Sequence, residues 1–132
     1  MKNNILPEVY CFIFLVFIPL QNINANNDLV IPDISGIWEN LDENGDATEA
    51  KFTFSQDGKY LDGTFTDSKN GEIIVEAPST GFIDINGNVI FDIYFGRITS
   101  TNRLKLSSDK NNLDGTYINN AGHKGEVHIR RQ

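Results

Sequence analysis

Four of the chain's Asn-Gly and Asp-Gly pairs divide it into short segments and constrain its fold more than any other feature. They stand at Asn44-Gly45, Asp57-Gly58, Asn70-Gly71 and Asn86-Gly87, and the first three recur every thirteen residues. Such pairs tolerate a positive φ and therefore close tight hairpins between twisted strands. The spacing predicts antiparallel strands joined by short turns.

Between these turns, apolar and polar residues alternate with the period of a β-strand. Residues 50–55 and 61–66 each place apolar or small residues at every second position. Such alternation is typical of a strand with one buried face. Further runs cover residues 72–76, 81–85, 88–98, 103–107, 113–119 and 125–131. Because no segment shows a helical period, we predict an all-β fold, a small antiparallel up-and-down β-barrel of about eight short strands.

The first 25 residues differ from the rest in composition. An apolar block of twelve residues, Val9 to Leu20, follows Lys2 and precedes a polar stretch that ends at Ala25. The block is shorter than the about 20 residues that cross a bilayer, which is typical of a secretory signal peptide. We therefore expect a signal peptide at 1–25 and a single β-barrel domain at 26–132, secreted or periplasmic. An uncleaved anchor and a buried strand are the alternatives for this block.

The net charge indicates which partners are unfavourable, and the cysteine content indicates whether disulfides can form. The chain has a net charge of −7 and a pI of about 4.6. An acidic surface argues against nucleic acid and against anionic membranes, which both attract Lys and Arg. We expect no nucleic-acid partner and no stable membrane insertion after cleavage. The single cysteine, Cys11, lies in the leader, so no disulfide would form in the mature chain.

The only tryptophan lies in the first strand-like stretch, which starts at Ile34. Alternation places Ile34, Gly36 and Trp38 on one face of that strand. A glycine two residues before a large aromatic residue lets another backbone or ring lie close. We therefore expect Gly36 and Trp38 at a closed end of the barrel.

An internal repeat supports a meander of equivalent hairpins. Residues 54–65 align without gaps with residues 106–117, and six of the twelve positions are identical. Both copies contain Leu-Asp-Gly-Thr followed by an aromatic residue, with glycines at Gly63 and Gly115. We expect the leucine and the aromatic residue to face the core and the glycine to relieve a bend in the strand.

These features resemble the calycins, the group of small antiparallel barrels that includes lipocalins, avidins and fatty-acid-binding proteins. The resemblance rests on Ser35-Gly36-Ile37-Trp38, on the two Leu-Asp-Gly-Thr hairpins, which look avidin-like, and on arginines in the last strand. It implies that Trp38 lies at the closed end of the barrel and that an arginine from the last strand packs over it. Arg131 shares a face with Val127 and Ile129, so alternation favours Arg131 over Arg130.

The acidic segment 42–46, with Glu49 nearby, is the best candidate for a cation site. It offers oxygen ligands at alternate positions, which suit a hard cation. However, its glycine precedes the third acidic residue, and Thr53 occupies position twelve, so the EF-hand pattern fails. We interpret the segment as a solvated hairpin loop and expect no metal site.

Catalytic signatures are also missing from the sequence. His123 and His128 lack a third partner, and His128 shares an outer strand face with Glu126. Asp92 falls on the less apolar face of its run, so we expect it to be exposed. No Gly-x-Ser-x-Gly, His-Glu-x-x-His or phosphate-binding loop occurs. We expect neither enzymatic activity nor a cofactor.

Two hypotheses for function remain. The sequence favours a non-catalytic interaction or inhibitor-type module that binds an unknown protein partner through its acidic loops. The alternative is a calycin-like carrier of a small apolar molecule at the open end. Runs of six to eight residues with many large Phe side chains predict a filled interior, without a cavity of about 300 Å³ or more beside Trp38. No exposed aromatic cluster is expected to mark an interface.

Overall fold

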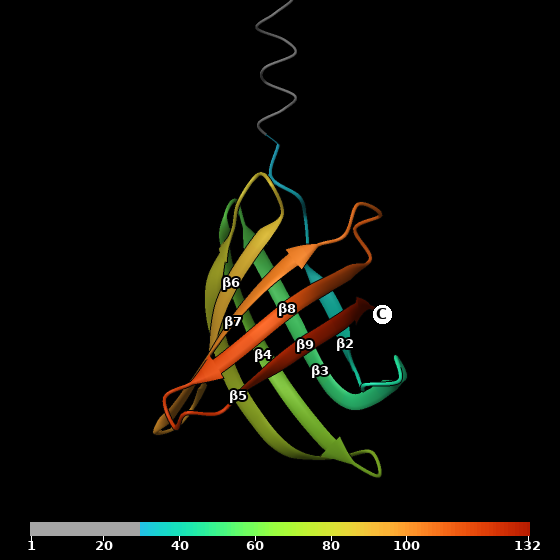
Figure 1. Cartoon of the computed structure of the whole chain (residues 1–132), viewed down its shortest axis with the longest axis vertical. Helices are drawn as coiled ribbons and strands as arrows, with labels where there is room; N and C mark the ends of the chain where they lie inside the picture. The colour runs from blue at the N-terminus through green and yellow to red at the C-terminus, as the bar shows by residue number, and fades with distance from the viewer. Residues whose placement is uncertain (1–29) are drawn as a thin grey trace, which may run out of the picture. The chain divides into compact units, whose positions relative to one another are not determined.

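Eight antiparallel strands follow one another around a closed barrel in the order of the sequence (Figure 1). The computed structural model describes residues 30–132, and this part of the chain contains no helix. The strands are β2 (Gly36–Leu41), β3 (Ala47–Asp57), β4 (Tyr60–Lys69), β5 (Glu72–Ile83), β6 (Asn88–Phe95), β7 (Ile98–Leu106), β8 (Asn112–Asn119) and β9 (Lys124–Arg131). Pairing of β9 with β2 closes the barrel. The predicted all-β, up-and-down barrel is confirmed, whereas the predicted signal peptide at 1–25 lies outside the described residues.

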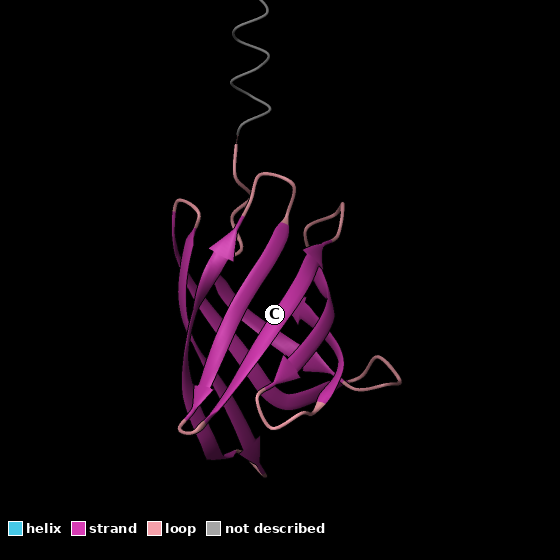
Figure 2. Ribbon diagram, turned by 60° about the vertical axis from the view of Figure 1, so that its left-hand side comes forward, coloured by secondary structure: helices cyan, strands magenta, loops and turns pink. Residues whose placement is uncertain are grey.

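The four pairs expected to make turns, at Gly45, Gly58, Gly71 and Gly87, all do so. Glycines 45, 58, 71 and 87 all have φ between 61° and 83°, and Asn70 also has a positive φ, of 53°. Two successive residues with positive φ, Asn70 and Gly71, match the hairpin geometry that fits the twist of paired strands. These turns divide between the two ends of the barrel (Figure 2).

Strands β3, β4 and β5 are longer than the sequence indicated. They contain 11, 10 and 12 residues, whereas runs of six to eight were expected. Strand β5 joins two expected runs, 72–76 and 81–85, across Pro78. Proline fits there because β5 pairs with β6 only from Ser79 onward, so position 78 pairs with β4 alone. The β4–β5 hairpin therefore extends beyond its neighbours (Figure 1).

The single run expected over residues 88–98 is wrong, because a turn divides it. Strand β6 ends at Phe95 and β7 begins at Ile98, and these two residues pair with each other. Gly96 makes the turn, with φ of 74°. Its neighbours are Phe95 and Arg97, so no Asn or Asp marks this turn in the sequence.

The inward glycines of the internal repeat lie where neighbouring strands approach most closely. A Cβ added at Gly63 would collide with the carbonyl oxygen of Thr53, and one added at Gly115 with that of Arg103. The leucines of both copies, Leu61 and Leu113, are buried in the core. Gly63 and Gly115 therefore leave room for the backbone of the neighbouring strand.

A chain of edge-to-face phenylalanine pairs runs along the interior. Phe54 packs on Phe91, Phe91 on Phe52, Phe52 on Phe65 and Phe65 on Phe95, with ring centroids 5.0–5.8 Å apart. Phe54, Phe91 and Phe52 are at most 5% exposed, whereas Phe95, at the other end of the chain of rings, is 37% exposed. The interior is therefore filled at one end and opens toward the other. We call these the closed end and the mouth.

Candidate functional site

The closed end is built around Trp38, which is fully buried. Its Nε1 donates a hydrogen bond of 2.9 Å to the carbonyl oxygen of Ile34, so its polar atom is satisfied. The guanidinium carbon of Arg131 lies 4.5 Å from the centre of the Trp38 ring. The expected contact between Arg131 and Trp38 is present, whereas Arg130 faces outward and pairs with Glu39 at 3.3 Å.

Arg131 also links residues 33–35, which precede β2, to the β7–β8 turn. Its Nη1 donates to the carbonyl oxygen of Ser35 at 3.2 Å, and its Nη2 to that of Asp33 at 3.1 Å. Nε and Nη2 both reach the carbonyl oxygen of Lys110, at 3.3 and 3.2 Å. The guanidinium N–H groups therefore donate to the protein's own backbone, and few of them remain to bind a ligand at this end.

Gly36 plays a different part from the one expected. Among the described residues, no atom lies within 4 Å of a Cβ added at Gly36, so it makes no room for a backbone or a ring. Its φ is instead 119°, a conformation that residues with a side chain rarely adopt. Gly36 is needed for the direction in which the chain enters β2, and it is exposed.

The mouth contains a pocket of about 380 Å³, so the expectation of a filled interior holds only for the closed end. Longer strands carry the wall of the barrel beyond the phenylalanine core, and several inward residues there are small or polar. The pocket is lined by Asn40, Ala50, Phe52, Phe65, Asp67, Ile93, Phe95, Ser100, Asn102, Tyr117, Asn119, Glu126 and Val127. Trp38 does not line it.

Asn102, on β7, is the most buried polar residue of the pocket, with 2% exposure. Its Nδ2 donates to the carbonyl oxygens of Ser100, at 3.2 Å, and Phe91, at 3.4 Å. Because carbonyl oxygens only accept hydrogen bonds, these contacts identify the nitrogen and leave Oδ1 as a free acceptor. No group within residues 30–132 donates to Asn102 Oδ1.

Two buried hydroxyl groups also lack a hydrogen-bond partner within residues 30–132. Ser79 and Ser100 are 5% and 7% exposed, and neither hydroxyl has a hydrogen-bond partner in the part of the chain that the structure describes. Ser100 lines the pocket beside Asn102. Most buried polar side chains are hydrogen-bonded, and each exception calls for an explanation. A ligand that enters the mouth would supply the partners that Asn102 and Ser100 lack.

The charge of the mouth is negative. Asp67 lies on the inward row of β4 after Phe65, lines the pocket, and is half-buried. Its Oδ1 accepts a hydrogen bond of 2.9 Å from the backbone N–H of Ser68. No Lys, Arg or His lines this pocket. The turns and strand ends around it carry more acidic than basic residues. The acidic residues are Asp42, Glu43, Asp46, Glu49 and Glu72, and the basic residues are Lys69, Arg97 and Lys124.

The acidic segment 42–46 is organised by its own backbone. Asp42 Oδ1 accepts hydrogen bonds from the backbone N–H groups of Asn44, at 2.9 Å, and Asp46, at 3.0 Å. Glu49 accepts from the N–H groups of the β4–β5 turn. Within residues 30–132, no group of three His, Cys, Asp or Glu side chains is placed to hold a metal ion.

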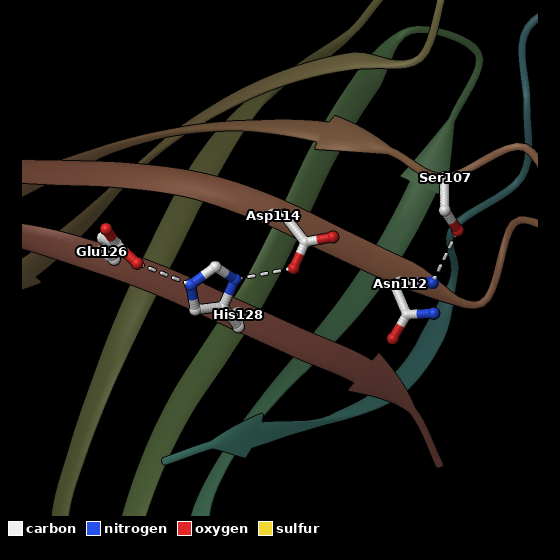
Figure 3. Close-up of polar contacts among 5 residues, drawn as sticks. All are labelled: Ser107, Asn112, Asp114, Glu126 and His128. Atoms are coloured by element: carbon white, nitrogen blue, oxygen red, sulfur yellow. Dashed lines mark hydrogen bonds and ion pairs between the residues drawn. The ribbon is translucent and has the colours of Figure 1, made fainter. Parts of the chain in front are cut away.

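His128 lies on the outer surface between two carboxylates (Figure 3). Its Nδ1 is 2.7 Å from Asp114 Oδ1 and its Nε2 is 2.9 Å from Glu126 Oε1. The hydrogen bonds to Glu126 and to Asp114 raise the pKa of His128 above its usual 6.5. The structure does not join His123 to this group, because the backbone N–H of His123 donates to Asn119 in the β8–β9 turn.

An exposed aromatic cluster lies on the outer face of β4–β6, although none was expected. Tyr60 and Phe82 are 55% and 51% exposed and pair across the strands with ring centres 5.6 Å apart. Phe82 pairs in turn with Ile90 on β6. Grooves of about 780 and 660 Å³ meet along this face. Asp92, expected to be exposed, is half-buried beside it and accepts a hydrogen bond of 2.6 Å from Thr101.

Comparison with known proteins does not identify a family, so the class of protein is judged from the fold and the sites. No protein-family model matches the chain, and no curated protein matches it either. Over residues 30–132, no helix has the length and apolar character needed to cross a membrane. The class that the structure defines is a closed, eight-stranded, antiparallel up-and-down barrel, compatible with calycin architecture.

The sequence did not identify the mouth as a site, although one signal was present. Ser100, Asn102, Leu104 and Leu106 share the inward face of β7, and the first two interrupt an otherwise apolar row. Polar residues on a buried strand face predict either a paired interior network or a ligand site. The predicted strand over residues 103–107 begins after Ser100 and Asn102 and therefore does not include them.

Proposed function

We propose that this chain is a non-catalytic binding protein of the calycin type, which holds a small organic molecule in the mouth of its barrel. The observation that carries the proposal is Asn102, a buried side chain whose Oδ1 lacks a donor and which lines the pocket. This order reverses the preference drawn from the sequence, which rested on a filled interior and on the acidic loops.

The dimensions and lining of the pocket support this proposal. Its volume of about 380 Å³ falls in the range of about 300 to 1,000 Å³ typical of small-molecule sites. Phe52, Phe65, Phe95 and Val127 provide apolar walls, and a few polar groups lie among them. Such a combination binds through apolar contact and selects through a few hydrogen bonds.

The chemistry of the lining supports binding without catalysis. General acid–base catalysis needs a positioned proton donor or acceptor, most often His, and covalent catalysis needs an activated nucleophile. The lining contains no His, Cys or Lys. Of its two carboxylates, Asp67 accepts from the Ser68 N–H and Glu126 bonds His128, and Ser100 has no base within hydrogen-bond distance among the described residues. We propose no enzymatic activity and no cofactor.

We also propose that the protein is exported, with cleavage near Ala25. The apolar block from Val9 to Leu20 supports export, although it lies outside the described residues. N-terminal sequencing of the extracytoplasmic protein should find a chain that begins near Asn26. A chain that begins at Met1 in a membrane fraction would contradict export.

Native mass spectrometry of protein isolated from its own host tests the binding proposal. We expect a non-covalent adduct of low mass. Ala50→Trp, which fills the mouth, should abolish the adduct, whereas Thr53→Trp, on the outward face of the same strand, should retain it. The proposal fails if no adduct is found, or if the adduct survives Ala50→Trp.

A second candidate function is supported by the aromatic cluster of Tyr60 and Phe82. Monomeric proteins rarely expose a contiguous apolar patch of large side chains, and aromatic residues are enriched in protein interfaces. The cluster supports an inhibitor-type or accessory module that binds a protein through the outer face of β4–β6. Light scattering of host-isolated protein should then show a complex that Phe82→Ser disrupts and Ile118→Ser, an equally exposed outer residue, leaves intact.

A further inference from the structure

We infer that the ligand of the mouth is a small organic cation, an amine that carries an aromatic or alkyl body. This inference rests on the proposed binding function and specifies its ligand. Three independent properties of the mouth support it: the sign of its charge, the kind of hydrogen-bonding atom that it leaves free, and the aromatic rings of its wall.

The first property is an inward carboxylate without a cationic partner. Asp67 lines the pocket, forms no salt bridge within residues 30–132, and shares the lining with no Lys, Arg or His. A neutral or anionic ligand that displaces water from this carboxylate would leave the charge uncompensated, which is unfavourable. An ammonium group would compensate it.

The second property is the direction of the missing hydrogen bonds. Asn102 Oδ1 can only accept, and an ionised Asp67 carboxylate can only accept. A protonated amine has N–H donors and no acceptor, so it matches both groups. A carboxylate or phosphate ligand could accept from the Ser100 hydroxyl, but it would place its acceptor atoms against Asn102 Oδ1 and Asp67.

The third property is the set of rings around the pocket. Phe52, Phe65, Phe95 and Tyr117 all line it, and Phe65 lies two residues before Asp67 on the inward row of β4. Aromatic faces attract cations through the ring quadrupole, and they also pack against an apolar body. A ligand with a cationic group and an apolar body would interact with the rings in both ways.

The field around the mouth favours the same ligand. Carboxylates outnumber cations in the surrounding turns and strand ends, and the whole chain carries a net charge of −7. A concave site lined by one sign of charge concentrates oppositely charged ligands and increases their association rate at low ionic strength. We therefore expect amine binding to weaken as salt is added.

Three matched probes test the inference: 2-phenylethylamine, 2-phenylethanol and 3-phenylpropionate. They share a phenylalkyl body and differ in a cationic, neutral or anionic head. Titrations of the isotope-labelled protein at pH 7 and low salt are followed by amide chemical shifts. We expect the amine to shift resonances of Asp67, Ser100 and Asn102, with at least tenfold higher affinity than the alcohol, and the anion to have no effect.

Two variants separate the charge of the ligand from the existence of the site. Asp67→Asn should reduce amine affinity about tenfold and leave alcohol affinity unchanged, whereas Asp62→Asn, on the outward face of β4, should change neither. Equal binding of alcohol and amine, insensitive to Asp67→Asn, would overturn the inference and leave the mouth as a binding site. Absence of amine binding at the mouth would also overturn it, and the host-isolated adduct would still decide the proposed function.

Discussion

The two ends of the barrel are made from the same eight strands but treat their polar groups in opposite ways. At the closed end, the Trp38 indole donates to Ile34, and the Arg131 guanidinium donates to three backbone carbonyl groups. At the mouth, Asn102 and Ser100 are buried without complete hydrogen bonding among the described residues. Polar groups that satisfy one another stabilise the fold, whereas those left unpaired keep the capacity to bind.

The carboxylates show the same difference. Asp33, Asp84 and Asp109, at the closed end, accept hydrogen bonds from nearby side chains and backbone, and these bonds lower the pKa of each carboxyl group. Asp67, at the mouth, accepts one bond from the next residue and lines a cavity. The three closed-end carboxylates hold turns, as Asp42 and Glu49 do beside the mouth, whereas Asp67 lines the cavity.

Trp38→Ala should produce the largest loss of stability. Removing a fully buried large aromatic residue typically costs about 3 to 5 kcal/mol, and the stack on Arg131 is lost as well. Arg131→Ala alone should cost less, and it should cost much less again in a Trp38→Ala background. Denaturant unfolding of the wild type, the two single variants and the double variant measures the coupling energy between Trp38 and Arg131. Equal costs of Arg131→Ala in both backgrounds would mean that the stack contributes nothing.

Gly115→Ala should be the next most damaging change. The added methyl group would collide with the carbonyl oxygen of Arg103 on β7, and such overpacking typically costs about 1 to 3 kcal/mol. Thr116→Ala, at the exposed next position, should change the free energy of unfolding by less than about 0.5 kcal/mol. Similar stabilities of the two variants would show that the strands are not held so closely.

Asn102→Leu should leave stability unchanged or raise it by up to about 1 kcal/mol, while it weakens ligand binding. The change replaces a buried, partly unpaired amide with an apolar group of similar size in an apolar environment. Thermal unfolding and probe titration of the same samples measure both effects. A loss of more than about 2 kcal/mol would mean that Asn102 serves the fold, and would remove the contrast between the two ends.

The smallest expected effect concerns His128 and pH. Because its folded-state pKa is raised, its contribution to stability should be fully present below pH 6.5 and should be lost as pH rises through the folded value. His128 is exposed, so the effect should be slight. His128→Gln should remove this part of the pH dependence, whereas His123→Gln should retain it. An unchanged profile in His128→Gln would contradict the role of Glu126 and Asp114.

Local sequence rules predicted the Asn-Gly and Asp-Gly turns and the contact of Arg131 with Trp38, but they did not predict the part that Gly36 plays. Asn70-Gly71 and the similar pairs predict hairpins because their preference for positive φ is a property of the residues themselves. Alternation alone chose Arg131 over Arg130, because a shift by one residue moves a side chain to the other face. The turn at Gly96 was missed because one glycine without Asn or Asp gives only a weak signal.

The mouth was harder to predict because it depends on lengths and contacts between distant strands. A count of phenylalanines does not reveal that β3 to β5 extend beyond them. Pro78 also made β5 look like two strands, because proline usually interrupts a strand. Whether Asn102 is paired depends on the positions of Phe91 and Ser100, and Phe91 is contributed by another strand. Phe82 lies outward because the inward row of β5 passes through Gly81 and Ile83.

The most direct test is a high-resolution crystal structure of the protein isolated from its own host. We expect electron density for a small molecule in the mouth, with a donor atom about 2.7 to 3.2 Å from Asn102 Oδ1 and its charged group beside Asp67. Trp38 and Arg131 should remain stacked at the closed end. A mouth filled by Phe95 and Tyr117, with Asn102 Oδ1 hydrogen-bonded inside the protein, would contradict the account.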